Sequence, residues 1–144
     1  VRKVILKRRN RVKTFVSLLL ARQTGEWVVY DDVGAPAPRP RVHVEPDALL
    51  ENVALQDRFY SETESALRRS GQPYIELWYE DLFGPDALAS VLDFLEMTGP
   101  PLLPSGETWK LTPVALNDVV ANFDVLAQGL RGSSLEAELH DTMW

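Results

Sequence analysis

The chain has no cysteine, which excludes a disulfide framework, a thiolate nucleophile and a cysteine-ligated metal site. It also lacks a long apolar run, because its longest one, residues 16–21, contains Ser17 and is far too short to cross a bilayer. The apolar segment of a signal peptide does not follow the basic start. We therefore expect a cytoplasmic protein without a membrane partner.

Acidic residues are missing from the first 22 positions, which hold eight Lys and Arg residues. The other 122 positions hold 7 basic and 21 acidic residues. A basic patch on an otherwise acidic protein suits a small polyanion better than a nucleic acid, which the acidic remainder would repel. The alternative is a solvated basic edge of a sheet, and charge alone does not separate the two.

Apolar periodicity and turn residues predict strands that alternate with helices along the chain. Asn10 is placed to cap the first helix and Gly25 to end it, and Pro46 suits the first turn of a long second helix. The two predicted strands are residues 1–6 (buried) and 74–79, residues 27–30 form a short apolar stretch, and the predicted helices are residues 10–23, 46–70, 86–97 and 114–130. This order indicates one α/β domain, residues 1–144, with a parallel sheet flanked by helices.

Polar and aromatic residues follow two of the predicted strands at their carboxyl ends, where open α/β sheets bind ligands. Residues 7–10 form the tip of the first strand, and residues 79–81 form the tip of the second. Arg9 has the guanidinium fork that fits a phosphate, and Ser17, eight residues later on the helix, has a hydroxyl donor. Tyr79 can lie flat against a base. The pattern predicts a site for a nucleotide 3′-phosphate and its adenine.

Three stretches carry a resemblance to a known family. The first is the predicted strand and helix, which run from Lys3–Asn10 (KVILKRRN) through Ser17 to residues 21–25 (ARQTG). The second is Tyr79–Leu82 (YEDL) with the helix that follows it. The third is Lys110–Pro113 (KLTP) with residues 120–126 (VANFDVL). In this order they resemble the sulfotransferases that use 3′-phosphoadenosine 5′-phosphosulfate (PAPS). The similarity is greatest to the bacterial carbohydrate branch, related to trehalose and nodulation-factor sulfotransferases.

The resemblance implies a P-loop-like sulfotransferase fold and transfer of a sulfuryl group from PAPS to a hydroxyl of a carbohydrate or small metabolite, without a metal. Arg9 and Ser17 would bind the 3′-phosphate, Tyr79 would contact the adenine, and Lys110 would be a further ligand of the same phosphate. Arg22 and Trp27 flank the turn at Gly25 and are predicted to frame the acceptor site, since sugars bind aromatic faces beside charged groups.

The family's phosphosulfate loop and its histidine or glutamate base normally precede the strand that matches here, and no residues of this chain match them. We therefore expect the chain to be the C-terminal portion of a sulfotransferase domain, inactive alone. A complementing N-terminal segment or a homo-oligomer would then be its partner, and its catalytic residues are unknown.

Other interpretations stay open. One is a small-molecule kinase-like enzyme, although the Gly-x-x-x-x-Gly-Lys-Ser/Thr loop is absent here. Another is a non-catalytic assembly module that keeps a degenerate nucleotide half-site, and nucleic-acid binding through the basic start is the weakest. Glu80 and Asp81 resemble paired catalytic carboxylates, but we expect them to cap backbone donors and basic side chains. His43 and His140 are expected at the surface.

Overall fold

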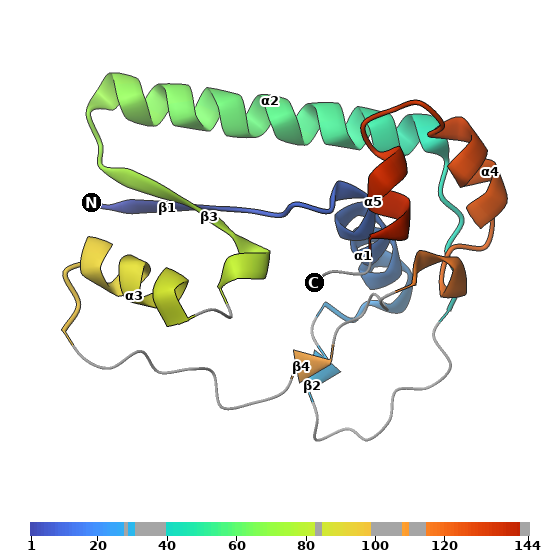
Figure 1. The fold of residues 1–144 in the computed structure, drawn as a ribbon, viewed down its shortest axis with the longest axis horizontal. Helices are drawn as coiled ribbons and strands as arrows, with labels where there is room; N and C mark the ends of the chain where they lie inside the picture. Colours follow the sequence, from blue (N-terminus) through green and yellow to red (C-terminus); the bar gives the residue numbers. More distant parts are fainter. Residues whose placement is uncertain (28, 31–39, 83–84, 99–107, 110–114, 142–144) are drawn as a thin grey trace. The chain divides into compact units, whose positions relative to one another are not determined.

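The structure, a computed structural model, describes residues 1–27, 29–30, 40–82, 85–98, 108–109 and 115–141. This part of the chain is a mixed α/β structure with two small sheets and five α-helices (Figure 1). The elements are β1 (Lys3–Lys7), α1 (Arg11–Thr24), β2 (Val29–Tyr30), α2 (Pro46–Ser70), β3 (Tyr74–Trp78), the 3₁₀ turn η2 (Tyr79–Asp81), α3 (Pro85–Phe94), β4 (Thr108–Trp109), the 3₁₀ turn η3 (Leu116–Asp118), α4 (Phe123–Gly129) and α5 (Glu136–His140).

The chain divides into two compact units. Unit 1 consists of Val1–Arg9 and Ala54–Leu103, and unit 2 of Asn10–Val53 and Pro104–Trp144. The two sheets belong to different units, since β1 and β3 lie in unit 1 and β2 and β4 in unit 2. That the whole chain is one domain stays a prediction.

Unit 1 is built on a parallel pair of strands. β1 pairs with β3 in a register that runs from Lys3 opposite Tyr74 to Lys7 opposite Trp78. The carboxyl-terminal half of α2 lies on one side of the pair and α3 on the other, so that the strands form a layer between helices (Figure 1). Arg2 fastens α3 to the start of β1, because its guanidinium donates to the carbonyl of Phe94 and pairs with Glu96.

The first strand is less buried than we predicted. Ile5 is buried, whereas the side chains of Val4 and Leu6 remain 41% and 44% exposed. Within the described residues β1 pairs with β3 alone. Both faces of a strand are buried when neighbouring strands and helices surround it. A sheet of two strands is too small to bury both faces of β1.

Unit 2 contains the main described apolar core, to which α1 contributes four side chains, those of Val12, Phe15, Val16 and Leu20. The side chain of Asn10 caps α1, accepting a hydrogen bond from the Lys13 N–H at 2.8 Å. Gly25 ends it in the left-handed conformation (φ 75°) and donates its N–H to the carbonyl of Ala21 at 2.9 Å. Both predicted caps are confirmed. The core cluster comprises Val12, Phe15, Val16, Leu20, Val42, Val44, Leu49, Val53, Leu116, Val119, Val120, Leu126, Leu130, Leu135 and Leu139.

The single helix predicted for residues 114–130 is wrong, because the described part of this segment is interrupted. η3 gives way to a parallel bridge between Val42 and Val120, and α4 starts only at Phe123. Two backbone hydrogen bonds of 2.8 Å make the bridge, from the Val42 N–H to the Val119 carbonyl and from the Ala121 N–H to the Val42 carbonyl. Pairing with a distant segment therefore replaces helical hydrogen bonds here.

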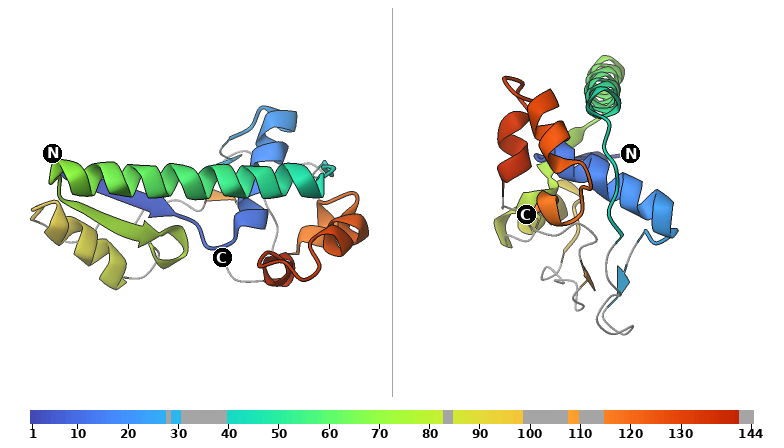
Figure 2. Two further views of the ribbon diagram at one scale, coloured as in Figure 1. Left: turned by 90° about the horizontal axis from the view of Figure 1, so that it is seen from above. Right: turned by 90° about the vertical axis from the view of Figure 1, so that its right-hand side faces the viewer.

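α2 runs without interruption from Pro46 to Ser70, the range that the sequence predicts (Figure 2). Its start is anchored by burial of Leu49 and Val53, whereas Leu55 and Phe59 are each 63% exposed. None of the helices in the described ranges combines the length and the apolar character that crossing a membrane requires. The predicted parallel sheet is present as the pair β1–β3, while β2 and β4 pair antiparallel.

Candidate functional site

The carboxyl ends of β1 and β3 lie side by side. Lys7, the last residue of β1, is the register partner of Trp78, the last residue of β3. The chain beyond each strand therefore leaves from the same edge, which confirms the prediction that residues 7–10 and residues 79–81 share one end of a sheet. We call the group formed by Arg8, Arg9, Trp78, Tyr79, Glu80 and Asp81 the strand-end cluster.

Arg9 is held by a carboxylate of the same cluster. Its guanidinium donates two hydrogen bonds to Asp81, from Nη1 to Oδ1 at 2.6 Å and from Nη2 to Oδ2 at 2.8 Å. Both side chains are 49% exposed. The hydrogen bond from Arg9 lowers the pKa of Asp81 below its ordinary value, and the same bond raises the pKa of Arg9. The guanidinium also lies 5.2 Å from the ring centroid of Trp78.

Glu80 binds the backbone of the same arginine. Its two carboxylate oxygens share the N–H of Arg9 at 3.1 and 3.3 Å. Glu80 and Asp81 therefore act as predicted, one on a backbone donor and the other on a basic side chain. The turn η2 brings both to β1, and it is closed by a hydrogen bond from the Leu82 N–H to the Tyr79 carbonyl at 3.2 Å.

Tyr79 is half-buried, and the guanidinium of Arg8 lies over its ring at 4.0 Å from the centroid. Arg8 was not among the site residues predicted from the sequence, so this contact was not predicted. Within the described ranges, Arg8 has no carboxylate partner, unlike its neighbours Lys7 and Arg9. A signal was available, since Arg8 and Tyr79 each follow the paired strand ends by one residue.

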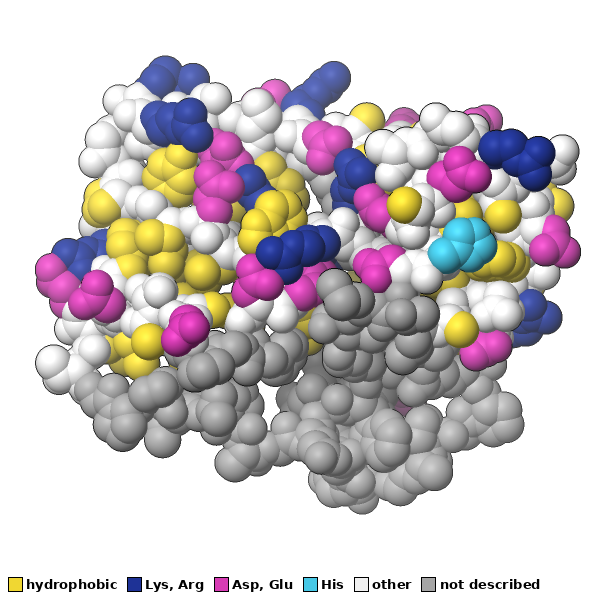
Figure 3. Space-filling view, viewed as in Figure 1, with side chains coloured by type: hydrophobic (Ala, Val, Ile, Leu, Met, Phe, Trp, Pro, Cys, Tyr) yellow, Lys and Arg dark blue, Asp and Glu magenta, His cyan; other side chains and the backbone are white. Residues whose placement is uncertain are grey.

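Lys7 lies between two carboxylates that the sequence did not point to. Its ammonium group pairs with Glu64 of α2 and, at 2.7 Å, with Glu76 of β3, and it lies 5.6 Å from the ring centroid of Tyr60. These hydrogen bonds raise the pKa of Lys7, Glu64 contributing most. Lys7 therefore joins α2 to the sheet. Figure 3 shows such pairs of basic and acidic side chains, set among apolar ones, on the part of the surface that belongs to the strand pair and α3.

The other predicted site residues belong to unit 2 or lie outside the described residues. Ser17 is half-buried on α1, and Arg22 and Trp27 are exposed on either side of Gly25, with Trp27 64% exposed. Lys110 lies outside the described residues. The structure thus places Arg9 and Tyr79 in one cluster, and leaves the predicted roles of Ser17, Lys110, Arg22 and Trp27 as predictions.

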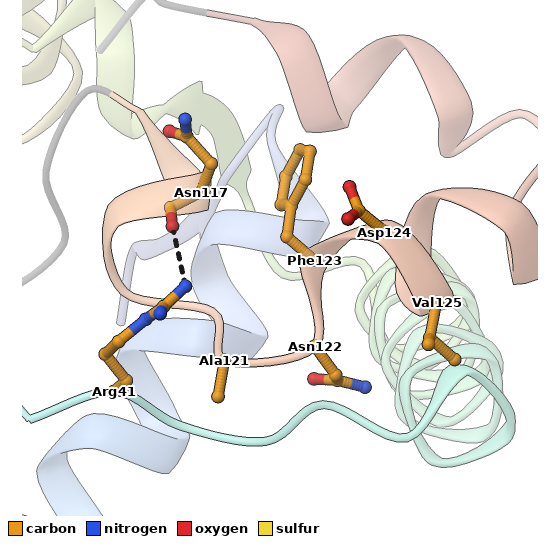
Figure 4. Close-up of a pocket in the computed structure, with 7 residues that line it drawn as sticks. All are labelled: Arg41, Asn117, Ala121, Asn122, Phe123, Asp124 and Val125. Carbon is orange, nitrogen blue, oxygen red and sulfur yellow. Dashed lines mark hydrogen bonds between the residues drawn. The ribbon is translucent and has the colours of Figure 1, made fainter.

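Unit 2 has a shallow pocket of about 560 Å³ that no sequence pattern predicts (Figure 4). Its wall is formed by Arg41, Asn117 and residues 121–125. Nη2 of Arg41 is already engaged there, since it donates to the carbonyls of Asn117 at 3.1 Å and Val120 at 2.8 Å. Arg41 therefore holds η3 against the neighbouring segment, and none of the predicted site residues lines the pocket.

The two histidines are exposed, as predicted; His43 pairs with Glu45 at 2.8 Å, and the ring of His140 packs edge-on against Phe123. In the described ranges, no group of three or more His, Asp or Glu side chains is arranged to hold a metal ion. The chain was also compared with protein-family models, with curated proteins and with solved structures, and none of the three comparisons finds a match.

Proposed function

We propose that the chain binds the adenosine 3′-phosphate part of PAPS, as the C-terminal portion of a P-loop-like sulfotransferase domain. The acceptor would be a hydroxyl of a carbohydrate or small metabolite. Arg9 would hold the 3′-phosphate with Ser17 and Lys110, and Tyr79 would contact the adenine. Arg22 and Trp27 would bind the acceptor.

The observation that carries the proposal is the parallel pairing of β1 with β3. It places Arg9 and Tyr79, which follow different strands, at the same sheet edge. In open α/β sheets this edge binds nucleotides. A phosphate is bound well by a guanidinium fork, and an adenine by an aromatic face. The strand-end cluster contains both, since Arg9 lies two residues after β1 and Tyr79 one residue after β3.

The ion pair of Arg9 with Asp81 is compatible with ligand binding. Both partners are half exposed, and water and salt screen an exposed pair of this kind, so that it contributes little to stability. A phosphate dianion can form the same two-bond contact with the guanidinium and carries more charge than a carboxylate. Exchange of one anion for the other therefore has a small free-energy cost.

In such a site the chain's residues would position the donor and would not take part in bond making. Transfer of a sulfuryl group resembles phosphoryl transfer, in which positioning and cationic stabilisation of the leaving group supply most of the rate enhancement. Arg9 binds at the 3′-position, remote from the sulfuryl group at the 5′-position. The proposal therefore concerns donor binding and assigns no general base.

Calorimetric titration with adenosine 3′,5′-bisphosphate tests the proposal. We expect binding that plain AMP does not reproduce, and a loss of affinity of about tenfold or more in Arg9→Ala, since the variant removes charge-assisted hydrogen bonds to the 3′-phosphate. Arg69→Ala is the matched control, because it removes an exposed arginine from the end of α2 in the same unit. It should leave the affinity unchanged.

Two other results would contradict the proposal. Preferential binding of ATP with Mg²⁺ would favour the kinase-like alternative. Absence of binding to adenosine 3′,5′-bisphosphate, ATP and AMP, in a chain that is folded by circular dichroism, would favour the assembly module.

A further inference from the structure

The Nη1–Nη2 fork of the Arg9 guanidinium, one of the donor pairs that a phosphate can use, is taken by the chain itself. Asp81 receives both of them, Nη1 at 2.6 Å and Nη2 at 2.8 Å. This is the fork-to-fork arrangement that arginine also forms with phosphate, and the same two N–H groups cannot serve both anions. Asp81 therefore occupies the place that a phosphate bound to this fork would take.

The backbone of Arg9 is occupied in the same way. Its N–H lies between the two carboxylate oxygens of Glu80, at 3.1 and 3.3 Å. Two consecutive residues of η2 thus supply the anionic partners of one arginine. Because Glu80 binds a main-chain group, it fixes the position of the turn relative to the end of β1, while Asp81 binds the group that can turn toward a ligand.

The carboxylate of Asp81 can move away from Arg9 into solvent. Its side chain is 49% exposed, it belongs to a 3₁₀ turn of three residues, and Arg9 is the one partner that its carboxylate has in the described part of the chain. When the carboxylate rotates into water it is rehydrated, so its departure needs no rearrangement of buried groups.

We propose that Asp81 is an internal ligand of Arg9 that competes with a phosphate for the Nη1–Nη2 fork, and that it thereby lowers the affinity of this site for phosphate-bearing ligands. The inference rests on the proposed function, since it concerns the same arginine. The exchange is non-covalent: the carboxylate leaves the guanidinium and the phosphate takes its two hydrogen bonds. A carboxylate that stays nearby also repels an incoming dianion, and both effects weaken binding.

Removing the charge of Asp81 should therefore strengthen phosphate binding. In Asp81→Asn the amide is a weaker partner for the guanidinium, and we expect adenosine 3′,5′-bisphosphate to bind about two- to fivefold more tightly, the factor that corresponds to an exposed ion pair. Binding of adenosine, which lacks phosphate, should not change. Asp81→Glu keeps the charge and should show little gain.

The experiment compares the wild type, Asp81→Asn, Asp81→Glu and the control Asp93→Asn by calorimetry with adenosine 3′,5′-bisphosphate and with adenosine. Asp93→Asn changes the net charge by the same amount at an exposed position of α3 in the same unit. A second readout follows the Nε–Hε resonance of Arg9 by NMR while inorganic phosphate is added.

The outcomes separate the inference from the proposed function. A gain in Asp81→Asn alone supports the inference. Equal affinities of the wild type and Asp81→Asn would overturn it and leave the proposed function standing, and a weaker Asp81→Asn would overturn it by showing that Asp81 positions Arg9. If no variant binds the nucleotide, the proposed function fails, and the titration with inorganic phosphate tests the inference instead. A larger shift of the Arg9 Nε–Hε resonance in Asp81→Asn than in the wild type then supports the inference, and equal shifts overturn it.

Discussion

The side-chain amide of Asn122 pairs with both backbone groups of Val44. Its Oδ1 accepts a hydrogen bond from the Val44 N–H at 2.9 Å, and its Nδ2 donates one to the Val44 carbonyl at 2.8 Å. The amide thus continues the parallel bridge between Val42 and Val120 by one more step, where a peptide group would otherwise be needed. Val44 is fully buried, so its backbone groups depend on this partner.

We expect Asn122→Asp to destabilise the protein by about 1–3 kcal/mol, because the carboxylate cannot donate to the Val44 carbonyl and leaves a buried acceptor unsatisfied. Urea denaturation followed by circular dichroism measures the free energy of unfolding. Asn117→Asp is the matched control, since the side chain at 117 is exposed and, among the residues that the structure describes, Arg41 binds its backbone carbonyl and not its side chain. Equal losses in the two variants would show that the bridge does not depend on the amide.

The bridge between Val42 and Val120 was not predictable from the sequence, whereas local features of the helices were. Features decided by neighbouring residues were predictable: Asn10 and Gly25 delimit α1, and Pro46 opens α2 where expected. Their side-chain or backbone preferences act within one turn of helix. The broken helix after residue 114 was not predictable, because its apolar spacing fits a helix and the competing partner, Val42, lies almost eighty residues earlier.

The same distinction applies to the strand-end cluster. Adjacency of Arg9 and Tyr79 followed from a parallel sheet, and the capping role of Glu80 and Asp81 followed from carboxylates placed beside a basic strand end. That Asp81 takes both guanidinium donors, and that Arg8 covers Tyr79, depends on the side-chain directions that η2 creates. Sequence periodicity gives no information about a turn of three residues.

Glu138 of α5 caps α1 from the other end of the chain. Its carboxylate accepts from the N–H groups of Arg11 at 2.6 Å and Val12 at 3.3 Å, and from the Arg11 side chain at 3.0 and 2.8 Å, while its backbone carbonyl accepts from Asn10 at 2.8 Å. The free N–H groups of a helix start favour a negative charge at this point. α1 and α5 are therefore joined through one glutamate.

We expect Glu138→Ala to lower the free energy of unfolding by about 1.5–3 kcal/mol, since it removes charge-assisted hydrogen bonds from a mostly buried group. Glu138→Gln should lose less, because the amide oxygen still accepts. Urea denaturation of both variants, beside Glu51→Ala at an exposed position of α2, makes the comparison. A loss in Glu138→Ala no larger than in Glu51→Ala would mean that α5 does not anchor α1.

Gly129, at the end of α4, lies against Pro46 at the start of α2. A Cβ added at 129 would meet Pro46 Cγ at 2.7 Å and Cβ at 2.9 Å, closer than real Cβ atoms come to their neighbours. Gly→Ala in a helix normally stabilises by about 0.5–1 kcal/mol. Here the contact should reverse the sign, so that Gly129→Ala destabilises.

A double-mutant cycle with Pro46→Gly checks this explanation, since the second change removes both clashing atoms. Gly129→Ala should be less harmful in the Pro46→Gly background than in the wild type when both are measured by urea denaturation. An equal loss in the two backgrounds would place the cause elsewhere. Gly25→Ala serves as a contrast, because no atom of the described residues lies within 4 Å of its added Cβ, and we attribute its cost to the positive φ of 75°.

Because of the ion pair between Arg9 and Asp81, we expect the stability of the folded state to decrease at acidic pH. The pKa of Asp81 is lowered from its ordinary value of 3.8, chiefly by the hydrogen bond from Arg9. A carboxylate whose pKa is lower in the folded than in the unfolded state stabilises the fold above the unfolded value, and this contribution is lost as the pH falls through the folded pKa. We therefore expect the difference in the free energy of unfolding between the wild type and Asp81→Asn to shrink as the pH falls from neutral to strongly acidic.

Titration of the Asp81 carboxyl carbon by NMR measures the shift directly. In the wild type its midpoint should lie below 3.8, and in Arg9→Gln it should return toward that value, because the uncharged amide no longer favours the carboxylate. Arg69→Gln is the charge-matched control and should leave the midpoint where it is in the wild type. An unshifted midpoint in the wild type would mean that water, and not Arg9, is the main partner of Asp81 in solution, and the guanidinium would then be available to a phosphate without any exchange.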